Sequence, residues 1–199
     1  SVSPSLVHVF TKSSSKLRIP DLEYVMSPAS FKEGTVGFLD KVSGMTLGVW
    51  QTRPKSNGYV KINSKNIHEP PIINPNYLSD PYDVDVLLKS IKIGRNLLST
   101  SPLQPYLNGK ANPSHNLQTD DELLSWARNE GITVYHMIGT AKMGPKSDKM
   151  AVVNNELQVR GIESLRVADA SIMPAMPSGN TNAPTMMIAE KASDMILSE

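Results

Sequence analysis

Cysteine is absent from the 199 residues of this chain, and so is a marked excess of charge of either sign. Without thiols, the chain cannot form disulfides, use a catalytic thiolate or bind a metal through cysteine. Its 20 basic and 19 acidic residues nearly cancel, which argues against a surface built for nucleic acid or an anionic membrane. The longest apolar runs are well short of the ~20 residues of a membrane-spanning helix. The sequence therefore predicts neither a nucleic-acid partner nor a membrane span.

The chain does contain enough apolar material for a folded protein, because 39% of its residues are hydrophobic. This composition excludes bulk disorder, and the length suits one sizeable domain or two small ones. The sequence starts at Ser1, without an initiating methionine, a signal peptide or a charged leader. We therefore expect a fragment or a processed chain.

Short segments with alternating apolar residues predict several strands in the first part of the chain. These segments are Leu6–Phe10, Leu22–Met26, Leu47–Thr52 and Gly58–Ile62. Glu69–Pro75 contains three prolines, so we expect it to run extended across a surface.

Two helices are predicted in the middle of the chain. Asp80 and Pro81 suit the N-cap and first turn of one helix, whose apolar residues repeat at helical spacing up to Leu98. Thr119 and Glu122 form a capping box at the start of the second helix, and Gly131 ends it. We assign no chemistry to this region.

The composition changes at Gly131, after which short strands are expected to alternate with turns. The predicted strands are Ile132–Tyr135, Ala151–Val153, Leu157–Val159 and Leu165–Ala168. A final helix is predicted from Pro184 to Leu197, with Thr181 or Asn182 as its N-cap.

Of the four histidines, His136 has the context that best suits chemistry. It follows a predicted strand and precedes a glycine at position 139, which would let another group approach the backbone. A histidine with an ordinary pKa near ~6.5 can exchange protons at neutral pH. His8, His68 and His115 are expected to be solvated or structural, and the spacing of the four predicts no metal site. From the residues alone, a structural role for His136 stays open.

The loop before the last helix is the second candidate site. In Ser178–Thr185 a polar loop leads into a helix N-terminus, where backbone amides and the helix dipole favour an electron-rich ligand. The alternative is an ordinary capped helix.

The same regions resemble the C-terminal signature of the glucose–methanol–choline (GMC) oxidoreductases. The resemblance rests on blocks that match in order and spacing: Tyr135–Gly144, Val152–Val153, Leu165–Pro174 and Ser178–Thr185, with Arg53–Gly58 and Pro75–Pro81 upstream. It covers residues 53–199 well and residues 1–52 loosely. The residues of these blocks are most similar to those of arthropod and choline-dehydrogenase-like members.

This resemblance implies a mixed α/β fold (α/β, or α+β mixed). Residues 1–53 would belong to a substrate-binding domain with an antiparallel sheet, and residues 54–130 would connect it to the FAD-binding α/β domain. Residues 131–199 would form the catalytic and flavin-contacting segment that closes that domain. FAD is the implied cofactor, and a small-molecule alcohol, such as a sugar or a cyanohydrin, is the implied substrate.

The resemblance also assigns residues to the reaction. His136 would be the general base that accepts the hydroxyl proton, and Asn180 would hydrogen-bond the substrate oxygen while hydride passes to the flavin. Asp169 and Ala170 would lie along the ribityl and diphosphate part of FAD. Three further residues would lie against the pyrimidine edge of the flavin: Asn182, Pro184 and Thr185.

No Gly-x-Gly-x-x-Gly turn that would hold the FAD diphosphate occurs in the chain. We therefore expect an N-terminal FAD-binding portion to act as a partner, as a separate chain if the protein is active. Two alternatives stay open: a hydroxynitrile lyase of the same fold, against which Asn180 argues because such lyases have two histidines, and a non-catalytic fragment. The resemblance favours a secreted or extracellular location.

Overall fold

The computed structural model describes residues 5, 7–32, 35, 38–107 and 111–198, and the chain forms two packing units. One unit combines the described residues of Ser1–Ser56 with Leu78–Val134. The other combines Asn57–Tyr77 with the described residues of Tyr135–Glu199. The functional roles assigned to residues 1–53, 54–130 and 131–199 from the sequence stay predictions.

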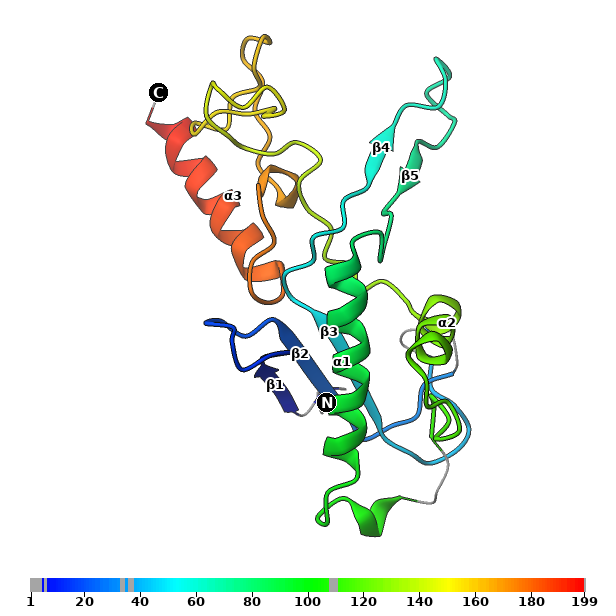
Figure 1. The fold of residues 1–199 in the computed structure, drawn as a ribbon. Helices are drawn as coiled ribbons and strands as arrows, with labels where there is room; N and C mark the ends of the chain where they lie inside the picture. Colours follow the sequence, from blue (N-terminus) through cyan, green and yellow to red (C-terminus); the bar gives the residue numbers. More distant parts are fainter. Residues whose placement is uncertain (1–4, 6, 33–34, 36–37, 108–110, 199) are drawn as a thin grey trace. The chain divides into compact units, whose positions relative to one another are not determined.

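A three-stranded antiparallel sheet forms the centre of the first unit (Figure 1). Its strands are β1 (Val7–Thr11), β2 (Leu22–Ser27) and β3 (Thr46–Gln51), in the order β1-β2-β3. All three strands were predicted, each to within one residue at its ends; Leu6, with which the first prediction began, lies outside the described residues.

The first helix, α1 (Pro81–Leu98), packs on one face of this sheet (Figure 1). Because side chains alternate along a strand, Leu22 and Tyr24 point to the same face, where they form a core with Val86 of α1. All three are at most 1% exposed. The Tyr24 hydroxyl donates a hydrogen bond of 2.7 Å to the carbonyl oxygen of Ser90, which links the sheet to the helix.

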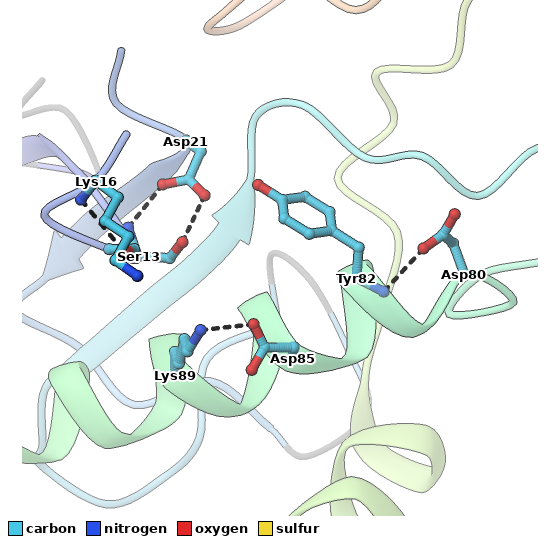
Figure 2. Close-up of polar contacts among 8 residues, drawn as sticks. Ser13, Lys16, Asp21, Asp80, Tyr82, Asp85 and Lys89 are labelled. Carbon is cyan, nitrogen blue, oxygen red and sulfur yellow. Dashed lines mark hydrogen bonds and ion pairs between the residues drawn. The ribbon is translucent and has the colours of Figure 1, made fainter. Parts of the chain in front are cut away.

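Side-chain caps start both helices of this unit, as the sequence predicted. Figure 2 shows Asp80 accepting a hydrogen bond from the backbone amide of Tyr82 at 2.8 Å, at the start of α1. Thr119 and Glu122 form the full capping box of α2 (Asp120–Glu130). A second buried cluster joins the two helices: Ile91, Leu123 and Ala127.

Asp21 fixes the connection between β1 and β2. This buried carboxylate accepts hydrogen bonds from the backbone amide and the hydroxyl of Ser13, both at 2.7 Å (Figure 2). A charged acceptor paired with two donors offsets the cost of removing the carboxylate from water.

A two-stranded antiparallel hairpin, β4 (Tyr59–Lys61) and β5 (Ile72–Asn74), belongs to the second unit. The first strand was predicted, whereas the proline-rich stretch of the second was expected only to be extended. Gly58 allows the two arms to approach, since a β-carbon there would lie 1.9 Å from the carbonyl oxygen of Asn74.

Four strands predicted after Gly131 are wrong: the described residues of these segments form isolated bridges at most. The bridges join Met143 to Val153, Val153 to Val159, and Gln158 to Arg166. The physical reason is a series of left-handed residues that interrupt the extended backbone: Tyr135 (φ 59°), Leu157 (φ 66°), Gly161 (φ 77°) and Ser164 (φ 57°).

The remaining elements are two short 3₁₀ helices, η1 (Gln104–Tyr106) and η2 (Ala170–Ile172), and the last helix, α3 (Asn182–Leu197). Helix α3 was predicted to start two residues later. The mixed α and β class with antiparallel sheets is confirmed. Among the described helices, none combines the length and apolar character needed to cross a bilayer.

Burial raises the pKa of the Tyr24 phenol to about 12, and the nearby negative charge of Asp21 adds to the shift. The folded protein therefore favours the neutral phenol, so this stabilisation is present below pH ~10 and is lost as the pH rises through about 12. We expect the urea midpoint of the chain to fall over this window, and to fall less in Tyr24→Phe. Tyr77→Phe, at a tyrosine that is 59% exposed, is the control, and its urea midpoint should fall with pH as much as that of the wild type. An equal fall of the midpoint in all three proteins would contradict the prediction.

Candidate active site

The structure brings His136 and Asn180 together, although they are 44 residues apart in the sequence. Nε2 of His136 lies 3.0 Å from Nδ2 of Asn180. The histidine is half-buried and the asparagine is exposed, so this edge of the imidazole ring is accessible to a small molecule. A neutral imidazole beside an amide donor can accept a proton from a hydroxyl group while the amide hydrogen-bonds the same oxygen.

The other ring nitrogen of His136 has a partner that the sequence did not identify. Nδ1 lies 2.9 Å from Oγ1 of Thr181, a residue that is only 7% exposed. From the sequence, Thr181 was a candidate only for capping α3. Its position directly after Asn180 was the one available signal for a role beside the histidine.

Thr181 occupies the N-cap position of α3, but its side chain does not cap the helix. An N-cap residue normally has extended backbone angles, which aim its oxygen at the first-turn amides, and such a cap contributes ~1 kcal/mol. Thr181 instead has helical angles (φ −85°, ψ −8°), and its hydroxyl is directed to His136. The N-terminus of α3 therefore lacks a stabilising cap from Thr181, because this hydroxyl contacts the imidazole.

Backbone geometry around His136 is fixed by two left-handed residues. Tyr135 immediately before it has φ 59°, and Gly139 has φ 86°. A left-handed conformation is unfavourable for tyrosine, and such residues are concentrated at functional sites. Beyond the turn, Ala141 and Met143 donate backbone hydrogen bonds to Ser171 and Ile172, at 3.0 and 2.7 Å.

An apolar core beneath the site holds the histidine segment and α3 in place. Its buried members come from three segments of the second unit: Val153, Leu157, Ile172, Met173, Ile188 and Ala192. Ile138, two residues after His136, packs against this core. Ile188 contributes from α3, which starts just after Asn180. The core therefore joins both residues of the pair.

The first turn of α3 offers backbone donors. Its first intrahelical bond runs from the Thr185 amide to the Thr181 carbonyl at 3.0 Å, so the amides of Asn182 and Ala183 precede the hydrogen-bonded part of the helix. Pro184 has no amide hydrogen, and the side chain of Thr181 does not cap this end. These amides and the positive end of the helix dipole suit an electron-rich group.

The structure also shows contacts of residues that the sequence assigned to a cofactor. The Asp169 side chain is exposed and caps η2 by accepting a 2.8 Å hydrogen bond from the Ser171 amide, while Ala170 packs against the core. The Thr185 hydroxyl donates to the Thr181 carbonyl at 2.7 Å. Their contacts with a cofactor, and those of Asn182 and Pro184, stay predictions.

Two cavities of the second unit lie away from the His136–Asn180 pair. One of about 280 Å³ is apolar and lies beside the start of α3, lined by Met143, Ile172, Met173, Pro184 and Met187 among others. A wider one of about 770 Å³ is lined largely by charged and polar residues between Lys146 and Arg166. Neither is lined by His136 or Asn180.

The remaining histidines do not form a site. His8 is hydrogen-bonded to the buried Glu23 at 2.9 Å, and His68 and His115 are exposed. Within the part of the chain that the structure describes, no group of three or more histidine or acidic residues could hold a metal ion.

Known proteins resemble this chain along most of its length. A family model described as GMC oxidoreductase matches residues 54–189. An alcohol dehydrogenase (acceptor) of Pseudomonas putida is 39% identical over 192 residues, and an oxygen-dependent choline dehydrogenase of Staphylococcus aureus is 39% identical over 189 residues. Each alignment covers 94% of this chain but only 34% and 33% of the relative, so the chain spans about a third of the length of these proteins.

A solved structure supports the fold. It is a formate oxidase of Aspergillus oryzae RIB40, in which the effect of a mutation on FAD modification was studied. It superposes with a TM-score of 0.80 and 26% sequence identity, over 92% of this chain and 32% of the enzyme. The choline dehydrogenase of Staphylococcus aureus matches the predicted choline-dehydrogenase-like resemblance. The arthropod resemblance stays a prediction.

Gly139→Ala tests whether the turn after His136 positions the imidazole. A β-carbon at φ 86° should lower the free energy of unfolding by roughly 1–2 kcal/mol. We also expect it to shift the imidazole NMR signals of His136. Gly161→Ala is the matched control, because Gly161 is also left-handed (φ 77°) and has open space around it. It should lower stability to a similar degree and leave His136 unchanged. Equal shifts of the His136 signals in both variants would refute the prediction.

Proposed function

Because the chain belongs to the GMC oxidoreductase family, we propose that its protein oxidises a primary or secondary alcohol in a reaction that requires FAD. The observation that carries the proposal is the exposed pair of His136 Nε2 and Asn180 Nδ2, 3.0 Å apart. Its relatives named for alcohol and choline support a small alcohol as substrate.

His136 accepts the proton of the substrate hydroxyl at Nε2. Asn180 donates a hydrogen bond to the same oxygen, which orients the carbon that carries the departing hydrogen. Thr181 stays bonded to Nδ1 on the opposite side of the ring. General-base assistance of this kind contributes typically ~10²–10⁴-fold in rate.

FAD, when bound, would supply the acceptor for the hydride that leaves the alcohol. The residues at the start of α3 suit one end of this group, because the helix presents first-turn amides that the Thr181 side chain does not cap. Asn182, Pro184 and Thr185 would lie at its pyrimidine edge, and Asp169 and Ala170 along its ribityl and diphosphate part. These donors favour the negative charge that a flavin gains when it accepts hydride.

The remainder of the FAD site would come from outside these 199 residues, as the coverage of about a third of the curated relatives supports. Purification of the 199-residue chain alone should then yield protein without flavin absorbance. Stoichiometric FAD in that preparation would contradict this expectation.

His136→Ala tests the proposed base in the enzyme that contains the FAD-binding portion. Loss of the proton acceptor should lower kcat/KM for alcohol by ~10²–10⁴-fold, measured by steady-state kinetics. His115→Ala, at an exposed histidine, is the control and should retain activity. Unchanged turnover in His136→Ala would show that another group accepts the proton.

Anaerobic mixing with substrate separates oxidation from the lyase alternative. An alcohol-oxidising enzyme should bleach the flavin absorbance, because the hydride stays on the cofactor in the absence of an acceptor. A hydroxynitrile lyase would release its products and leave the flavin oxidised. The asparagine at position 180 favours the first outcome.

A further inference from the structure

Thr181 is placed to control which nitrogen of His136 carries the proton. Its hydroxyl is buried, lies 2.9 Å from Nδ1 and is turned away from the first-turn amides of α3 that an N-cap threonine would normally bond. The carbonyl oxygen of Thr181 accepts hydrogen bonds from both the amide and the hydroxyl of Thr185. These two bonds fix the backbone of Thr181, so its side chain is held against the ring.

The two groups that contact the imidazole favour one arrangement of its ring hydrogen. With the amide nitrogen of Asn180 facing the ring, this group donates and Nε2, 3.0 Å away, accepts. A neutral imidazole has one donor and one acceptor nitrogen, and Nδ1 therefore carries the hydrogen. Thr181 Oγ1 accepts that hydrogen, which a hydroxyl oxygen can do because it has two lone pairs.

We propose that Thr181 is a positioning residue that holds His136 in the Nδ1–H tautomer, so that the lone pair of Nε2 points to the exposed side beside Asn180. The hydrogen bond at one ring nitrogen sets the state of the other. The consequence for catalysis rests on the proposed function, in which Nε2 receives the hydroxyl proton.

The same contact suits both charge states of His136. When Nε2 takes up a proton, Nδ1 keeps its hydrogen and continues to donate to Thr181. The ring therefore need not rotate during proton transfer, and the hydroxyl oxygen of Thr181 faces a donor before and after it. Removal of this acceptor would leave Nδ1–H without its partner. The exposed Asn180 amide can then turn its oxygen to the ring, so the hydrogen can move to Nε2, which could no longer accept a proton.

Long-range ¹H–¹⁵N NMR of the ¹⁵N-labelled chain at a pH where His136 is neutral tests the proposal. The wild type should show a protonated Nδ1 and an unprotonated Nε2, with the His136 signals identified by their loss in His136→Ala. Thr181→Val keeps the shape of the side chain and removes the hydroxyl, so we expect the hydrogen to move to Nε2. Thr181→Ser retains a hydroxyl and should restore the wild-type tautomer.

Two results would overturn the proposal: an Nε2–H ring in the wild type, or an unchanged Nδ1–H ring in Thr181→Val. The wild-type spectrum decides even if Thr181→Val does not fold. In the enzyme with its FAD-binding portion, Thr181→Val should lower kcat/KM by about 10–100-fold, the range known for removing the partner that orients a metal-binding histidine, and Thr181→Ser should recover most of it. The NMR measurement reads the tautomer without turnover, so the two proposals fail separately. If the wild type shows an Nδ1–H ring but His136→Ala keeps full activity, the proposed function is refuted and the role of Thr181 is not.

Discussion

The packing of α3 against the segment around Ile172 is the interaction on which the candidate site depends. Ile188 and Ala192 of the helix are buried with Ile172 and Met173, and Val153 and Leu157 complete the core. The histidine segment joins the same core through Ile138 and through backbone bonds to Ser171 and Ile172. Two polar side chains far apart in the sequence are therefore held 3.0 Å apart by apolar contacts beneath them.

The site itself departs from the local rules that stabilise the rest of the chain. Asp80 and Thr119 cap their helices, as their residue types favour. Thr181 holds the equivalent position in α3 but bonds an imidazole, and Tyr135 adopts a left-handed conformation beside the same histidine. Such departures are concentrated where a protein places reactive groups, because the surrounding packing compensates for local strain.

The strands and helices of the first unit follow the local preferences of their residues. Alternating residues in β2 place Leu22 and Tyr24 against α1, and the tyrosine hydroxyl is bonded to the helix backbone. The buried carboxylate of Asp21 accepts hydrogen bonds from both donors of Ser13. This regularity is the reason that its strands and helices were predictable from local patterns.

Sequence by itself determined the strands of the first unit, both capped helices, the existence of α3 and, through the matching blocks, the family and its candidate pair His136 and Asn180. The hairpin strand Ile72–Asn74 and the irregular course of residues 151–168 were decided by tertiary structure, because strand pairing and left-handed turns depend on partners distant in the chain. The bond from Thr181 to His136 was decided in the same way. A threonine before a helix has a strong local preference to cap it, and only the position of the imidazole in the folded chain overrides that preference.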